Sequence, residues 1–171
     1  MTISMYQASI PVVSRMLTNL RQILAKAEAH AQAKKIDPGV LLNSRLSADM
    51  LPLTKQVQFV SDTAKGMAAR LAGVENPPYE DKETTFAELY ARIDKTKAFL
   101  DSFKASQIDG SEDRDVALPL RDGTLNFKGQ AYLLGFALPN FYFHVVTTYA
   151  ILRHLGVDIG KRDYIGPPPQ A

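Results

Sequence analysis

The residues with the clearest chemical potential are an asparagine and a histidine spaced four positions apart. Asn140 and His144 lie in the largely apolar run Pro139–Gly156, and a helix there places both side chains on adjacent turns of one face. Two donors at this spacing, joined by a third group from another helix, form a familiar kind of facial metal site. Asp49, next to the apolar residue Met50, is placed to turn toward the same cavity.

A structural role for His144 is the alternative. A single histidine on an apolar helix face is more often a core residue bonded to a carbonyl or hydroxyl group, and the amide oxygen of Asn140 is a poor ligand for zinc or nickel. Tyr149 is a further candidate for lining a pocket, although aromatic residues at helical spacing commonly belong to the core. The sequence has no cysteine, no Gly-x-Ser-x-Gly and no Gly-rich phosphate loop, which excludes a thiolate site, a nucleophile elbow and a P-loop.

Four apolar stripes at helical spacing predict the elements that position these residues. The clearest stripe runs through residues 46–71, from Leu46 and Met50 onward, at alternating spacings of four and three. Similar stripes cover residues 13–31, 86–103 and about 140–155, and the polar side chains between them, Asn19 included, suit solvent. The helices over residues 46–71 and 140–155 are predicted to be neighbours, with Asp49 and His144 within hydrogen-bonding or shared-water reach.

The connection between the third and fourth stripes has a different pattern. Alternating apolar residues on both sides of Asp122-Gly123 predict a β-hairpin, because Asp-Gly is a strong signal for a tight hairpin turn. These elements together predict an all-α fold, an antiparallel four-helix bundle with a β-hairpin in the connection between helices 3 and 4. We expect one domain over residues 1–171, with residues 163–171 as an extended, proline-rich C-terminal tail.

Composition limits the classes of partner. The 171 residues carry 20 Lys and Arg against 18 Asp and Glu, a net charge of +2 that gives no reason to expect nucleic acid. No apolar stretch is long enough to span a bilayer, so we expect no membrane partner. The N-terminus lacks the basic and apolar regions of a signal peptide, and we therefore expect a cytoplasmic protein.

Several stretches of this sequence resemble a known family. Residues 46–53, Gln56-Val-Gln58, Leu138-Pro-Asn-Phe-Tyr-Phe-His144 and Tyr149–Arg153 are similar to a bacterial family of unassigned function within the DinB/YfiT-like metalloenzyme superfamily. The resemblance covers nearly the whole chain, and it implies a four-helix bundle and a homodimer. It also implies a divalent metal held by three histidines, one on helix 2 and a His-x-x-x-His pair on helix 4.

This sequence departs from that metal pattern. His144 takes the place of the second histidine of the pair, Asn140 occupies the first, and Asp49 is the nearest acid for the ligand from helix 2. Two of the three imidazoles are therefore missing, which weakens affinity for a transition metal. His144 and Asp49 remain the candidate metal ligands of a site that we interpret as degenerate, and no cofactor is assigned.

Three hypotheses for the function follow. The first is a small-molecule pocket between helices 2 and 4, with Asp49, Asn140, His144 and Tyr149 as its polar groups. The second is a divalent-metal-dependent enzyme of the thiol-transferase type. The third is a non-enzymatic, dimeric interaction module. The sequence leaves open whether any reaction is catalysed.

Overall fold

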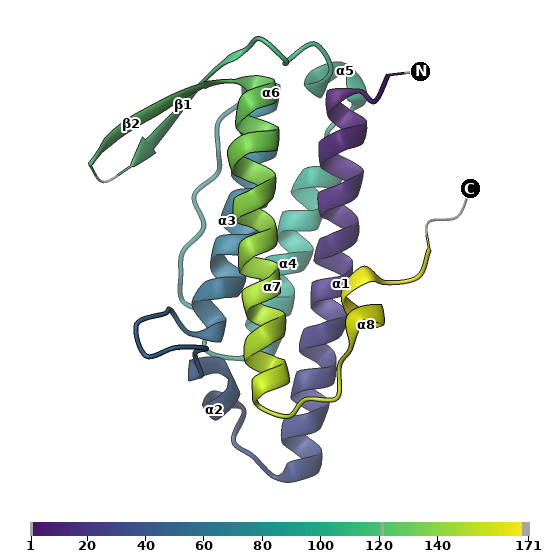
Figure 1. Ribbon diagram of the computed structural model, residues 1–171, viewed down its shortest axis with the longest axis vertical. Coiled ribbons are helices and arrows are strands. Elements are labelled where there is room, and N and C mark those ends of the chain that lie inside the picture. Colours follow the sequence, from purple (N-terminus) through teal and green to yellow (C-terminus); the bar gives the residue numbers. More distant parts are fainter. Residues whose placement is uncertain (1, 121, 169–171) are drawn as a thin grey trace.

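Four long helices form the main body of the molecule. The computed structural model describes residues 2–120 and 122–168. The four helices α1 (Met5–Lys34), α3 (Leu53–Ala72), α4 (Phe86–Asp101) and α7 (Leu138–His154) lie side by side (Figure 1). The shorter elements are α2 (Pro38–Asn43), α5 (Ala105–Ile108), β1 (Asp115–Leu120), β2 (Gly123–Lys128), α6 (Gly129–Tyr132), the π-helical turn Leu133–Ala137 and α8 (Lys161–Ile165). The chain is therefore mostly helical, with one small antiparallel sheet.

One hydrophobic core joins the four helices. Its fully buried side chains include Leu20 of α1, Val60 of α3, Ile93 of α4 and Val145 of α7. α3 packs against both α4 and α7, and α1 packs against α4 and α7. The prediction that the second and fourth helical segments are neighbours is confirmed. No helix of the described residues has the length and apolar character that crossing a membrane requires.

The predicted start of the second helix was wrong. α3 begins at Leu53 with Pro52 as its N-cap, whereas the apolar stripe had suggested a start near Leu46. A proline disfavours the helical conformation of the residue before it, which agrees with a helix that does not extend back through Leu51. Residues 44–52 form an irregular loop in which Leu46 is 43% exposed. The first part of the stripe therefore belongs to no helix.

The polar face of α1 differs from expectation at one position. Asn19 was expected in solvent but is 2% exposed, because α8 lies across this part of α1. Its Nδ2 donates to the main-chain carbonyls of Tyr164 and Ile165, both at 3.0 Å. Residues 163–165 are consequently helical rather than part of an extended tail, and residues 169–171 of the predicted tail lie outside the described residues.

The predicted hairpin is confirmed, with a shifted turn. β1 and β2 pair antiparallel, with Leu118 opposite Leu125 and Leu120 opposite Gly123. Gly123 therefore opens β2 instead of belonging to the turn, while Asp122 is a turn residue as expected. The hairpin projects from one end of the helices (Figure 1), and its base packs against the core through Val116 and Phe127.

The helical run that carries Asn140 and His144 contains a widened turn. Residues 133–137 are π-helical, and the N–H of Leu138 donates to the carbonyl of Leu133. Pro139 follows directly and has no N–H to donate to the carbonyl of Gly135, which agrees with an irregular turn at this point. The regular helix then starts at Leu138 and brings Asn140 and His144 to the side of α3.

Candidate functional site

Two side chains of α7 meet two side chains of α3. Nδ2 of Asn140 donates to Oγ1 of Thr63 at 3.2 Å. One turn further along α7, Nδ1 of His144 lies 2.7 Å from Oε1 of Gln56. Gln56 is 3% exposed, and His144 is partly buried. The polar pair predicted on the fourth helix therefore does face the second helix, and neutral polar groups satisfy it there.

The hydrogen bonds fix the tautomer of His144. Nε2 of Gln56 donates to the carbonyl of Leu51 at 2.9 Å, so its Oε1 must be the acceptor toward His144. In the neutral imidazole the proton therefore sits on Nδ1, and Nε2 carries the free lone pair. Phe59 stacks on the imidazole, with ring centroids 4.9 Å apart, and holds the ring plane.

The burial of His144 gives a testable dependence on pH. Burial lowers the pKa of His144 below its ordinary value of 6.5. The unfolded chain then binds a proton at a higher pH than the folded chain. The contribution of neutral His144 to the free energy of unfolding is therefore fully present above about pH 6.5 and is lost as the pH falls through the folded-state pKa. We expect wild type to lose more unfolding free energy than His144→Gln between about pH 7.5 and pH 5, measured by urea denaturation. Equal losses in the two proteins would contradict this prediction.

The other two predicted site residues lie elsewhere. Asp49 is exposed in the loop before α3, and its carboxylate accepts a hydrogen bond from the Ser47 hydroxyl at 2.7 Å. No hydrogen bond joins Asp49 to His144, and Gln56 takes the position that Asp49 was expected to fill. Tyr149 packs edge-on against Tyr164 of α8, with ring centroids 6.2 Å apart, and so belongs to another face of α7.

The donors present do not fit a transition metal. The groups that meet here are two amides, one hydroxyl and one imidazole, whose Nδ1 is already hydrogen-bonded to Gln56. A catalytic zinc site commonly has three nitrogen, sulfur or carboxylate ligands from the protein. Within the described residues no group of three His, Cys, Asp or Glu side chains is placed to hold a metal ion.

A cavity of about 470 Å³ lies beside Asn140. Its walls come from α3, the strand β1, the linker of residues 73–85, α6, the π-helical turn and the start of α7. The lining is apolar or aromatic at Phe59, Pro78, Tyr79, Leu118, Pro119, Leu120, Tyr132 and Phe136, and polar at Asp62, Thr63, Lys65, Arg70, Asn76 and Asn140. A concave, mostly apolar space with a few polar groups is typical of small-molecule sites.

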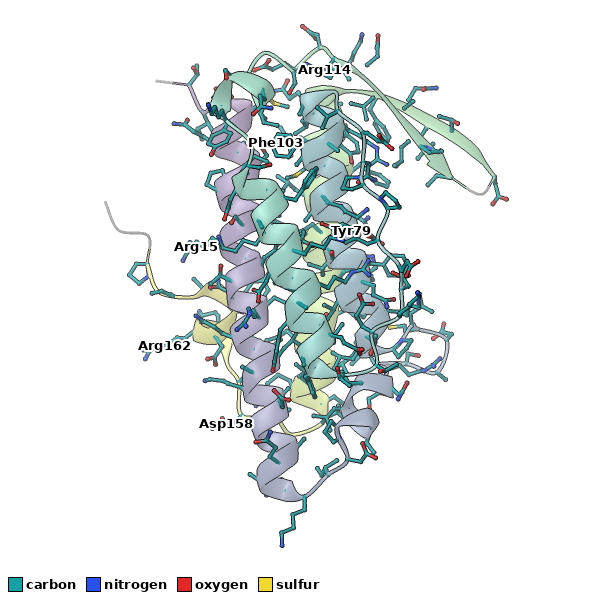
Figure 2. The ribbon with its side chains drawn as sticks, turned by 180° about the vertical axis from the view of Figure 1, so that it is seen from behind. Arg15, Tyr79, Phe103, Arg114, Asp158 and Arg162 are labelled. Carbon is teal, nitrogen blue, oxygen red and sulfur yellow. The ribbon has the colours of Figure 1, made fainter. Side chains whose placement is uncertain are left out.

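A network of charged side chains holds the linker that forms one wall. Arg92 of α4, whose side chain is 2% exposed, lies 2.9 Å from Asp62, 3.1 Å from Asp81 and 3.0 Å from Glu83. Lys65 lies 3.3 Å from Asp62 and also donates to Asn76 at 3.3 Å. The linker consequently runs back along the outside of α3, where Figure 2 shows Tyr79.

Tyr79 separates this cavity from a wider depression over α4. That depression measures about 650 Å³ and is lined by charged residues of both signs, Lys82, Glu83 and Lys95 among them. Several of these charges already have partners, since Lys82 pairs with Glu80 and Lys95 lies 4.0 Å from the centre of the Tyr79 ring. It lies away from Asn140 and His144, so the smaller cavity is the better candidate site.

Sequence reasoning missed Gln56, Thr63 and Arg92. Gln56 and Thr63 each stand one position before a stripe residue of α3, so helical spacing could have placed them beside the seam. Arg92 directly precedes the buried Ile93, but nothing local indicates a buried arginine. Its carboxylate partners lie on other elements.

Comparisons with known proteins identify relatives of this chain. A family model described as a domain of unknown function (DUF1993) matches residues 5–165. Among solved structures, the chain is similar to a DinB family member protein from Shewanella denitrificans, whose crystal structure was determined at 1.83 Å resolution. The two chains are 42% identical, the match covers 97% of this chain and 94% of the other, and the TM-score is 0.91. No curated protein matched.

The two matches agree with each other, because the family model and the similar structure both cover almost the entire chain. They also agree with the resemblance carried by the stretch that ends in His144. The chain therefore belongs to the DUF1993 family of DinB-like proteins, a family of unknown function.

Proposed function

We propose that this protein, as an antiparallel four-helix bundle, binds a small molecule in the cavity between α3 and α7. The observation that supports the proposal is the cavity of about 470 Å³ next to Asn140, the one residue of the predicted site that lines it. Asn140 and Thr63 contribute amide and hydroxyl groups to its wall, while Phe59 and Phe136 contribute apolar surface. The volume lies within the range of pockets that enclose small ligands.

His144 then has a supporting role. It does not line the cavity, but Phe59 does, and the imidazole stacks on that ring while Gln56 holds its Nδ1. His144 therefore positions an apolar wall of the pocket. This differs from the sequence-based proposal, in which His144 itself contacted the ligand.

Two alternatives have less support. A metal-dependent enzyme of the thiol-transferase type would need more metal-binding donors than the single imidazole beside Asn140 supplies. A dimeric interaction module is favoured by two exposed apolar residues on one face of α7, Phe143 (56% exposed) and Val146 (47%). Light scattering, which measures the mass of the particle in solution, tests that alternative.

Filling the cavity tests the binding proposal. Thr63→Trp places an indole in the cavity, and we expect compounds that raise the melting temperature of wild type to have no effect on this variant. Stabilisation by a ligand follows from its binding to the folded state alone, so the loss reports lost binding. Gln32→Trp, at an exposed position near the end of α1, adds the same side chain outside the cavity.

The measurement is a thermal-shift screen of small aromatic and polar compounds on the three proteins. The proposal predicts hits shared by wild type and Gln32→Trp and absent from Thr63→Trp. Hits that shift all three proteins equally, or no hits for wild type, would contradict it.

A further inference from the structure

We propose that the ligand is a small organic anion and that Arg70 binds its charged group. The inference rests on the proposed function and adds the chemical class of the ligand. It starts from the charges in the cavity wall, which are Asp62, Lys65 and Arg70. Two cations face one carboxylate, so the lining carries a net charge of +1.

The two cations differ in how they are compensated. Lys65 has the Asp62 carboxylate at 3.3 Å and the Asn76 side chain as an acceptor. Arg70 has no carboxylate within 4.0 Å among the described residues, and its recorded side-chain hydrogen bond runs from Nη1 to the Tyr132 hydroxyl at 3.3 Å. A guanidinium stays charged at every physiological pH and offers five N–H donors. Arg70 thus presents a charge and donors that the protein itself leaves available.

The guanidinium of Arg70 is held against the wall. Gly66 stands one turn earlier on α3, and a Cβ there would collide with Nη1 of Arg70, so the guanidinium rests against the helix surface. On the other side it lies 5.9 Å from the centre of the Tyr132 ring, which is itself 2% exposed. A planar group that is already fixed in this way loses little further conformational freedom when it binds a pair of carboxylate or phosphate oxygens.

The rest of the cavity indicates the body of the ligand. Phe59 and Phe136 present aromatic surface, and Leu118 and Pro119 of β1 present aliphatic surface. A single net positive charge favours a monoanion over a dianion, because the second negative charge would be left without a partner. The ligand class that fits is therefore a singly charged organic acid with a flat, apolar body.

A matched pair of fluorescent probes tests this class. 8-Anilinonaphthalene-1-sulfonate is a flat aromatic monoanion, and N-phenyl-1-naphthylamine is the same ring system without the sulfonate. Both are titrated into wild type, Arg70→Met and Arg162→Met. Arg162 lies on α8, on the other side of the helices from the cavity residue Tyr79 in Figure 2, and its replacement removes the same charge outside the cavity.

We expect Arg70→Met to weaken binding of the sulfonate by at least about tenfold, since hydrogen bonds to charged groups contribute that much to affinity. Binding of the neutral probe should stay within about twofold, and Arg162→Met should resemble wild type with both probes. Arg70→Gln is measured in parallel, in case the methionine variant does not fold. Thermal unfolding of each variant shows that the comparison is between folded proteins.

The other outcomes separate the two proposals. Binding of both probes with equal affinity, unchanged by loss of Arg70, would overturn the anion inference and leave the pocket in place. Loss of both probes to the same extent in Arg70→Met would show that Arg70 shapes the cavity rather than binding a charge, which also overturns the inference. No binding of either probe to wild type would overturn the inference together with the proposed function.

Discussion

Arg92→Met is expected to lower the free energy of unfolding by about 3 kcal/mol, near the lower end of the range for breaking a buried ion pair. The arginine side chain is 2% exposed, and its removal leaves Glu83, which is 12% exposed, without its cation. The effect stays near the lower end because Asp62 and Asp81 are 37% and 41% exposed and keep part of their hydration. Urea denaturation of wild type and variant measures the difference.

An exposed ion pair provides the control for this prediction. Lys97 lies 2.7 Å from Asp101 on the surface of α4, and Lys97→Met should change stability by less than about 0.5 kcal/mol. Arg92→Lys should recover only part of the loss, because one ammonium group cannot reach three carboxylates with the geometry of a guanidinium. A loss below about 1 kcal/mol in Arg92→Met would mean that the linker of residues 73–85 is held by other contacts.

Leu53→Ala is expected to lower the free energy of unfolding by about 2–5 kcal/mol, the range for removing a buried leucine side chain. Leu53 is the first residue of α3 and is 0% exposed, so the truncation leaves a cavity in the core. Leu46→Ala is the matched control. Leu46 belongs to the same apolar stripe in the sequence but is 43% exposed, and the expected loss is below about 1 kcal/mol.

The comparison of the two leucines also tests where α3 begins. If residues 46–52 formed a further part of the helix packed on the core, the two substitutions would have similar effects. Chemical denaturation of both variants at one pH decides the question. Similar losses would contradict the position of the helix start at Leu53.

The sequence predicted the helical segments well where burial follows a simple period. The stripe residues Leu20, Val60 and Ile93 are all buried, because an amphipathic helix is stable only when its apolar side is covered. The hairpin was also predictable, because its signal, alternating apolar residues around a glycine-containing turn, lies within a few neighbouring residues. The stripe failed over residues 46–52, where apolar spacing continues but Pro52 sets the start of the helix.

Polar contacts between distant segments could not be predicted from the sequence. From the sequence alone Asn19 is predicted to be a surface residue, but in the structure α8 covers it. Arg92 has the sequence surroundings of a surface charge, but in the structure it is paired with Glu83 of the linker. Such contacts depend on how segments far apart in the chain are placed. Burial of an arginine is stable only when carboxylate groups compensate its charge, and no local sequence pattern indicates which distant residues will do so.

For the candidate site, the sequence was sufficient to place Asn140 and His144 on one face of a helix, because a spacing of four residues sets their relative direction. The residues that they meet depend on how the helices pack. An apolar stripe covers a wide sector of each helix, so it indicates that α3 and α7 are each packed against other helices but leaves their relative rotation and offset open. That offset is what places Gln56 rather than Asp49 against His144, and Thr63 against Asn140.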